Sequence, residues 1–123
     1  MTYFKTNNIL YRAEIKSNKI DQMWDGRESK TITLEMTYTE AKNIFNNGLK
    51  WSIVVREEYI DPESNETINI DSEFDNSEYN IAGIIIDNRD GTISAKMGKE
   101  TELEQAVTSE ESTAAYNEGV NRA

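Results

Sequence analysis

Apolar and polar residues alternate in steps of two over several segments, and this pattern limits the fold more than any other feature of the chain. The alternation runs through Ile9–Lys16, Thr31–Tyr38 and Trp51–Arg56. Successive side chains of a β-strand point to opposite faces of a sheet, whereas side chains of a helix repeat every 3.6 residues. The three segments are therefore predicted to be strands, the first two of them half-buried.

A continuous β-branched run, Ile84–Ile86, predicts a further strand that is covered on both faces and lies centrally in the sheet. The next five residues, Asp87–Gly91, tolerate the left-handed backbone of a tight turn, and alternation resumes over Ile93–Met97. These two strands are predicted to form a β-hairpin.

Two helices are expected. The first spans Glu40–Asn47, with Thr39 as its N-cap and Gly48 at the position of a left-handed C-cap residue. The second begins near Thr101 and has only a thin apolar stripe, so it should dock on the sheet or on a second copy of the chain. Residues 109–123 are polar enough to form a frayed tail.

These elements predict a single α+β domain over residues 1–123: a mostly antiparallel sheet of about five strands, one short internal helix and a C-terminal helix. No apolar run approaches the roughly 20 residues that a membrane helix needs. Residues Met1–Asn8 lack the charged-then-apolar pattern of a signal peptide. We therefore expect a soluble, intracellular protein.

The composition removes most catalytic chemistries. The chain has neither His nor Cys, which excludes thiol nucleophiles, Ser-His-Asp triads and zinc sites with nitrogen or sulfur ligands. No pair of carboxylates stands out as a glycosidase-like acid and base, so the chain is not expected to be an enzyme. The net charge of -10 disfavours binding to nucleic acid.

Acidic residues are concentrated in one segment. Glu57–Glu78 contains nine acids, no base and the only proline, and is predicted to be a solvated loop or the extended tip of a hairpin. Its alternating acids, Asp71, Glu73 and Asp75, resemble part of a calcium loop, but the turn glycine and the final glutamate of that motif are missing. No metal site is predicted.

The more basic first half of the chain holds a candidate site. Trp24-Asp25-Gly26-Arg27 places an aromatic ring, a turn and a guanidinium just before a strand, and Arg56 ends the strand that starts at Trp51. Arginine pairs bidentately with phosphate and aromatic rings stack on bases, so these residues could hold a small nucleotide. Alternatively, both arginines pair only with neighbouring acids, and Trp24 and Trp51 belong to the core.

Several strings of the sequence resemble small proteins of bacteriophages and prophages. They are Trp24–Arg27, Thr31–Tyr38, Gly48–Ile53, Tyr79–Gly83, Asp87–Thr92 and Lys96–Lys99. Within this group, residues 8–105 are most similar to the anti-Thoeris cyclic-ADP-ribose sponge family of the first type. The resemblance implies a non-catalytic, cofactor-free protein of the host cytoplasm that binds a cyclic ADP-ribose isomer and withholds it from its effector. It also implies a β-rich fold with C-terminal helices that forms dimers or larger homo-oligomers, with pockets at subunit contacts.

The resemblance assigns roles to particular residues. Arg27 and Arg56 are expected to hold the pyrophosphate and to lie close together in the assembly, and Asn88 is expected to recognise an edge of the ligand. An aromatic residue packs on the adenine, and Tyr79 or Phe74 is expected to supply it. The family's more C-terminal basic group has no clear counterpart here, and Lys99 is its nearest substitute. With Trp24, these residues make up the predicted ligand site.

Two other functions fit the same sequence. A tail or head accessory protein of a phage virion would have this composition and these strands, and would bind no nucleotide. An acidic protein-protein inhibitor would depend on the acids of Glu57–Glu78, which a nucleotide sponge would not need.

Overall fold

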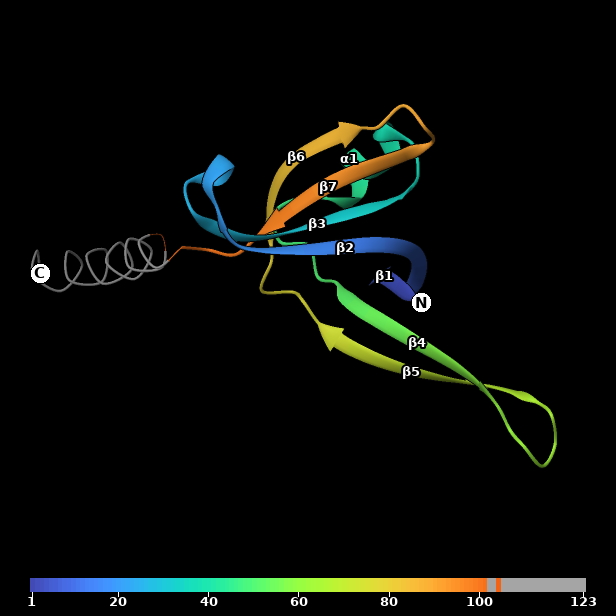
Figure 1. The fold of residues 1–123 in the computed structure, drawn as a ribbon. Coiled ribbons are helices and arrows are strands. Elements are labelled where there is room, and N and C mark those ends of the chain that lie inside the picture. Colours follow the sequence, from blue (N-terminus) through green and yellow to red (C-terminus); the bar gives the residue numbers. More distant parts are fainter. Residues whose placement is uncertain (102–103, 105–123) are drawn as a thin grey trace, which may run out of the picture.

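The computed structural model describes residues 1–101 and Glu104, and within them the chain forms a seven-stranded sheet, one α-helix and one turn of 3-10 helix (Figure 1). In chain order the elements are β1 (Thr2–Thr6), β2 (Ile9–Asp21), η1 (Gln22–Trp24), β3 (Arg27–Glu35), α1 (Tyr38–Ile44), β4 (Ser52–Ile60), β5 (Thr67–Asp75), β6 (Ile81–Asp87) and β7 (Thr92–Gly98). The strand order is β5-β4-β1-β2-β3-β7-β6, and every neighbouring pair is antiparallel. The predicted class, a mostly antiparallel sheet with one short internal helix, is confirmed.

The long strand β2 connects two parts of the sheet. Its first residues, Ile9–Arg12, pair with β1, and from Ala13 onward it pairs with β3. The register of the second pairing shifts between Asn18 and Asp21, where the strand leads into η1. As a result β1, β4 and β5 lie on one side of β2, and β3, β7 and β6 lie on the other (Figure 1).

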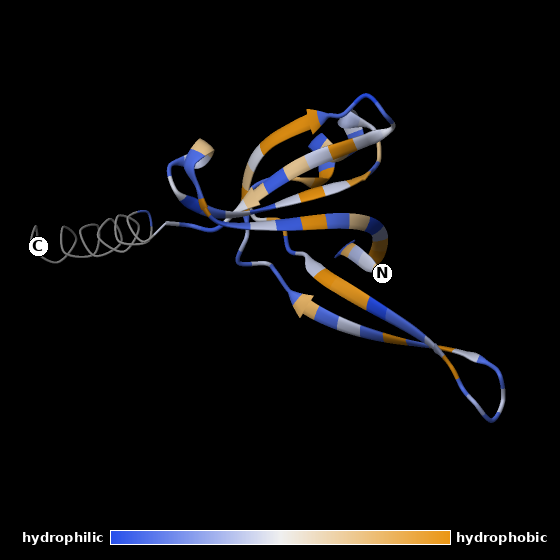
Figure 2. Cartoon of the chain, in the orientation of Figure 1, coloured by the Kyte–Doolittle hydropathy of each residue, from blue (hydrophilic) through white to orange (hydrophobic). Residues whose placement is uncertain are grey.

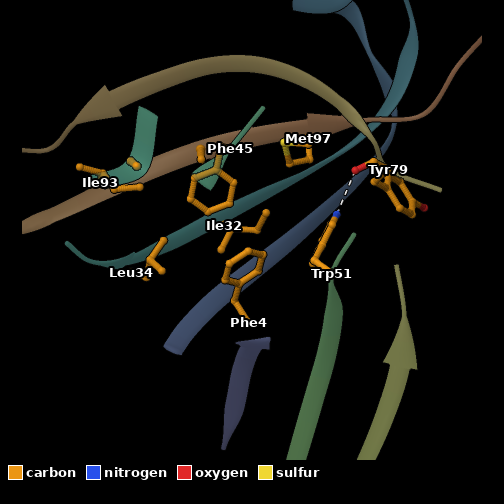
Figure 3. Packing of buried hydrophobic residues seen from close by; sticks show 10 residues of the cluster. Phe4, Ile32, Leu34, Phe45, Trp51, Tyr79, Ile93 and Met97 are labelled. Carbon is orange, nitrogen blue, oxygen red and sulfur yellow. Dashed lines mark hydrogen bonds between the residues drawn. The ribbon is translucent and has the colours of Figure 1, made fainter. Parts of the chain in front are cut away.

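The core lies on one face of this sheet, where alternate residues of the strands meet α1 and the segment after it. Its buried apolar side chains are Phe4, Ile32, Leu34, Ala41, Phe45, Trp51, Tyr79, Ile93, Ala95 and Met97 (Figure 3). The rings of Phe4 and Phe45 are 5.0 Å apart, and those of Phe4 and Trp51 are 5.5 Å apart. Each of the large apolar side chains, such as Phe4 and Ile32, contributes about 1.5 to 3 kcal/mol when it leaves water. The strand periodicity therefore corresponds to a real buried face.

Helix α1 begins earlier than predicted. Thr37, not Thr39, is the N-cap: its backbone is extended, and its side-chain oxygen accepts a hydrogen bond from Glu40 N at 3.1 Å. The helix ends at Ile44, and Phe45 leaves it to enter the core. The helix therefore lies two to three residues earlier than the predicted span of 40–47. Thr37 and Thr39 can each act as an N-cap, so the sequence alone did not distinguish them.

The hairpin of β6 and β7 is confirmed, but the predicted position of β6 is wrong. Arg89 and Gly91 adopt positive φ in the turn, as the sequence indicated. However, β6 is the last strand of the sheet, and Ile84 and Ile86 are 60% and 49% exposed. The isoleucine run reflects the preference of β-branched residues for extended backbone, which does not require burial on both faces.

The sheet has seven strands where about five were expected. The short strand β1 was not predicted, and β5 lies in the acidic segment that was predicted to be a loop or a hairpin tip. That segment is an extended hairpin in which β5 pairs with β4 over nine residue pairs, around a turn at 61–66. The hairpin projects from the rest of the molecule as an arm (Figure 1).

Strand β3 starts at Arg27 rather than Thr31 and ends at Glu35, so it includes one of the predicted site residues. Beyond β7, Thr101 and Glu104 form reciprocal hydrogen bonds: Glu104 N donates to Thr101 Oγ1, and Thr101 N donates to Glu104 Oε1. This is the capping-box arrangement of a helix start. The remainder of the predicted C-terminal helix and the predicted frayed tail lie outside the described residues.

None of the helices described here has the length and apolar character required to cross a membrane.

Candidate anion-binding site

Arg27 and Trp24 form a stacked pair at the start of β3. The guanidinium carbon of Arg27 lies 4.9 Å from the centre of the Trp24 ring. Between the two residues, Asp25 and Gly26 both adopt positive φ, which reverses the chain tightly enough to bring ring and guanidinium together. Only 9% of the Arg27 surface is exposed. The Trp-Asp-Gly-Arg motif is therefore a compact local structure.

Two glycines from β6 and β7 form the surface on which this pair rests. A Cβ atom at Gly83 would lie 2.8 Å from Trp24 Cη2, and one at Gly98 would lie 2.8 Å from Trp24 Cζ3 and would overlap Arg27 Cδ. Real Cβ atoms do not approach other atoms so closely. The absence of side chains at both positions thus allows the ring to lie against the sheet.

The turn that carries Trp24 is anchored by a buried carboxylate. Asp21 is 2% exposed, and it accepts hydrogen bonds from Ser29 Oγ at 3.0 Å and from Met23 N at 3.0 Å. Lys96 Nζ lies 2.6 Å from its Oδ2. The hydrogen bond with Lys96 holds the pKa of Asp21 below its usual value, so the anchor is ionised near neutral pH.

The guanidinium of Arg27 already holds an anion. Its Nη1 donates to Glu104 Oε1 at 2.6 Å and to the Lys99 carbonyl at 2.8 Å, and its Nη2 donates to Glu104 Oε2 at 3.0 Å. The buried Nε has no hydrogen-bond partner among the described residues. The hydrogen bond from Arg27 lowers the pKa of Glu104 to about 2, and the same bond raises the pKa of Arg27. Carboxylate and phosphate oxygens both fit this bidentate geometry.

Lys99 connects Arg27 to a second group of side chains. Its carbonyl accepts from Arg27, while its ammonium lies 3.8 Å from Glu28, 3.6 Å from Glu78 and 5.6 Å from the centre of the Tyr79 ring. The Tyr79 hydroxyl donates to Glu28. Burial, and then the bond to Glu28, raises the pKa of Tyr79, so this hydroxyl stays protonated.

Lys30 completes the second group. Its ammonium lies 4.6 Å from the centre of the Tyr79 ring and donates to Asn76 Oδ1 at 2.5 Å. Burial lowers the pKa of Lys30 from its usual value. Tyr79 is only 4% exposed, so little of its ring is accessible to solvent. The ammonium groups of Lys30 and Lys99 both lie close to this ring.

The structure thus brings four of the seven predicted site residues to one end of the sheet, where β3 begins and β7 ends. They are Trp24, Arg27, Tyr79 and Lys99, and we refer to them as the Arg27 cluster. Their joint position follows from the antiparallel pairing of β3 and β7, in which Ser29 lies opposite Gly98.

The other three predicted residues lie elsewhere. Arg56, on β4, pairs with Asp71 at 2.7 and 3.0 Å and stacks on Tyr3. Strands β1 and β2 lie between its strand and β3, so one chain does not bring Arg56 to Arg27.

Phe74, on β5, is 55% exposed and lies outside the cluster. Asn88, in the β6-β7 turn, donates to Thr92 Oγ1 and Ser94 Oγ, both at 3.0 Å. Among the described residues, neither Phe74 nor Asn88 contacts the Arg27 cluster.

Sequence reasoning missed three polar contributors to this end of the sheet: Glu28, Lys30 and Glu104. The alternation of β3 could have indicated the first two, because Glu28 and Lys30 share a face with the buried Ile32. Nothing local could have indicated Glu104, which is 77 positions from Arg27.

A surface groove lies away from the Arg27 cluster. This groove of about 900 Å³ is lined by parts of β1, β2 and β3, including Tyr11 and Ile15, and contains none of the seven predicted site residues. Its charged side chains are Arg12, Glu14 and Glu35. Among the described residues, Arg12 forms no two-pronged contact with a carboxylate in this groove, whereas Arg27 does so with Glu104, so we place the candidate anion site at the Arg27 cluster.

Among the described residues, no group of three or more acidic side chains is arranged to hold a metal ion. Comparisons with protein-family models, with curated proteins and with solved structures found no match for this chain.

Proposed function

We propose that this chain is a non-catalytic binding protein that sequesters a small phosphate-bearing nucleotide, and that a cyclic ADP-ribose isomer is its ligand. The observation that carries the proposal is the bidentate carboxylate on Arg27. A guanidinium that is stacked on Trp24 and nine-tenths buried presents its two outer nitrogens in the geometry that a phosphate needs.

In this proposal the ligand phosphate takes the position of the Glu104 carboxylate. Lys99 accepts from Arg27 through its carbonyl, and its ammonium, which lies 3.8 Å from Glu28 and 3.6 Å from Glu78, is the proposed second contact to the ligand. The Tyr79 hydroxyl donates to Glu28, but burial raises its pKa and keeps it protonated, which fits capture of the ligand without cleavage. The choice of a cyclic ADP-ribose isomer rests on the sequence resemblance.

Calorimetry of the purified chain with cyclic ADP-ribose isomers tests the proposal. The complex is then heated, and the released ligand is identified by chromatography. Binding with the ligand recovered intact would support sequestration. A modified ligand would mean catalysis, and no binding to any isomer would favour the virion accessory protein.

Matched variants locate the site. Lys99→Gln removes one charge from a partly exposed side chain and should weaken binding, whereas Lys19→Gln removes the same charge from an exposed residue of β2 and should not. Arg27→Lys should weaken binding further, because an ammonium cannot replace the two-pronged contact. If Arg56→Ala also weakens binding, a second copy of the chain completes the site; if it does not, one chain is sufficient.

A further inference from the structure

The outer half of the β4-β5 arm is a two-stranded structure without support from the rest of the sheet. Strand β1 begins opposite this arm at Thr2, and just before it the Met1 amino group donates to the Arg56 carbonyl while the Met1 carbonyl accepts from Arg56 N. Beyond Arg56, residues 57–70 pair only with each other among the described residues. Two-stranded hairpins are at best marginally stable in water. The arm would therefore gain stability from a further strand.

One face of the arm is apolar and remains exposed. Cross-strand partners share a face, so the pairs Ile53–Phe74 and Tyr59–Ile68 place their side chains on the same side as Ile70. Tyr59, Ile70 and Phe74 are 47%, 45% and 55% exposed. Figure 2 shows apolar and polar residues alternating along much of β5, whereas β4 has an apolar run, Ile53–Val55, followed by the charged residues Arg56–Glu58. These side chains are about half exposed, and with Ser72 and Glu57 on the same face they form a largely apolar contact surface.

The opposite face of β5 is acidic. Asp71, Glu73 and Asp75 occupy alternate positions on it, within a segment of nine acids and no base. Arg56 and Lys5 pair with Asp71 and Glu73, which leaves most of the negative charge of the arm uncompensated. A partner that covers the arm must therefore supply positive charge on this face and apolar side chains on the other.

The hydrogen-bond register identifies which backbone groups are available. At one end of the hairpin Asn76 N donates to Trp51 O, and at the other Asp61 N donates to Glu66 O. In an antiparallel ladder this makes the even-numbered residues of β5 the ones bonded to β4, and it points the N-H and C=O of Asn69, Asp71 and Glu73 outward. Within the part of the chain that the structure describes, no strand lies on that side, since β5 ends the sheet order.

We propose that the outer edge of β5 binds an extended segment of another protein, in which basic and apolar side chains alternate, as an added strand of the sheet. Backbone hydrogen bonds to Asn69, Asp71 and Glu73 supply affinity, and the two faces of the arm select the alternating pattern. The edge is long and has no proline or bulge, and its acidic side chains disfavour pairing with a second acidic edge while they favour a basic partner. The proposal does not rest on the nucleotide proposal, because the tip of the arm points away from the Arg27 cluster (Figure 1).

The test uses the full chain and a labelled nine-residue peptide in which lysine and valine alternate. Fluorescence anisotropy should detect binding that weakens as salt is added, because the charged pairs are exposed. A peptide of the same composition with all lysines first should bind much more weakly. Equal binding of the two peptides would mean that only charge attracts them, and would overturn the proposal.

A pair of variants tests the backbone contact directly. Asn69→Pro removes one outward N-H without touching the β4 ladder and should lower the affinity about tenfold. Asn69→Thr keeps that N-H and should bind like the natural chain. Unchanged affinity in Asn69→Pro would overturn the proposal.

Modified peptides provide a second test. It uses only the natural chain, so it does not depend on whether Asn69→Pro folds correctly. An added strand directs only alternate amides toward β5, so N-methylation of one alternate set should abolish binding and N-methylation of the other should not. Equal binding of both methylated peptides would exclude strand addition. The natural chain could instead form dimers that bind no peptide and that the Asn69→Pro substitution dissociates. That result would show that a second copy of the chain occupies the edge and that the proposal is wrong.

Discussion

Arg27, the first residue of β3, and Glu104 form a two-pronged ion pair with Nη-Oε distances of 2.6 and 3.0 Å. The pair closes a separation of 77 positions and attaches the segment after β7 to the start of β3. The same contact defines the anion-binding geometry of the Arg27 cluster. Its strength and its response to pH therefore bear on both stability and binding.

Loss of this ion pair should be visible in the pH dependence of stability. The pKa of Glu104 is lowered from 4.5 to about 2, so its contribution to stability is complete above pH 4.5, declines as the pH falls, and is absent below about 2. Glu104→Gln lacks this contribution at every pH. Thermal unfolding should show a lower Tm for the variant at pH 7, and a difference that narrows as the pH approaches 2. A pH-independent difference would mean that the pair contributes through packing alone.

The same variant should bind the proposed ligand more tightly than the natural chain. Glu104 occupies the two nitrogens that the phosphate is proposed to use, so removal of its charge removes an internal competitor. Calorimetry with cyclic ADP-ribose isomers measures this difference, and Glu63→Gln serves as the control, because it removes the same charge from an exposed acid in the turn of the arm. Weaker binding by Glu104→Gln would indicate that the carboxylate supports the site instead.

Gly98→Ala should destabilise the chain by about 1 to 3 kcal/mol, because the added methyl group overlaps Arg27 and approaches the Trp24 ring. Urea denaturation measures the loss, and the tryptophan emission of the folded variant should shift as Trp24 is displaced. Ile84→Ala, at an exposed position of the edge strand β6, should change the stability by about 0.5 kcal/mol or less. Equal effects of the two substitutions would contradict the close packing at Gly98.

Trp51→Phe should cost about 1 to 3 kcal/mol, because it leaves the buried carbonyl of Tyr79 without its donor. Trp51 Nε1 donates to that carbonyl at 2.9 Å within the core (Figure 3). Trp24 Nε1 makes no such bond among the described residues, so Trp24→Phe should cost less. Denaturant titration of the two variants under the same conditions makes the comparison.

Removal of charge from the β4-β5 arm should affect peptide binding at the arm but not nucleotide binding at the Arg27 cluster. Replacement of four acids of the arm by glutamine should weaken binding of the lysine-valine peptide, because it lowers the negative charge around the retained Asp71, Glu73 and Asp75, and should leave nucleotide binding unchanged. The four acids, which no base of the described chain pairs with, are Glu57, Glu58, Glu63 and Glu66. Anisotropy and calorimetry on the same sample measure both. Loss of nucleotide binding in this variant would show that the arm belongs to the nucleotide site.

Local features of the sequence determined five of the seven strands and the β6-β7 turn, but not β1 or β5. Alternation in Ile9–Lys16 and Thr31–Tyr38 predicted segments that belong largely to β2 and β3, because a half-buried strand requires that period wherever it lies in a sheet. Asp87–Gly91 likewise predicted its turn, because positive φ is a local requirement.

Strand order and the meeting of distant residues were decided only by the tertiary structure. The Ile84–Ile86 run has the same local preference at an edge as in the centre, so its exposure depends on which strands pair beside it. Arg27 and Lys99 meet because β3 pairs with β7, and Arg56 stays apart because β1 and β2 intervene. The period of a strand specifies which of its side chains share a face, but it carries no information about the neighbouring strand, and the candidate site depends on that neighbour.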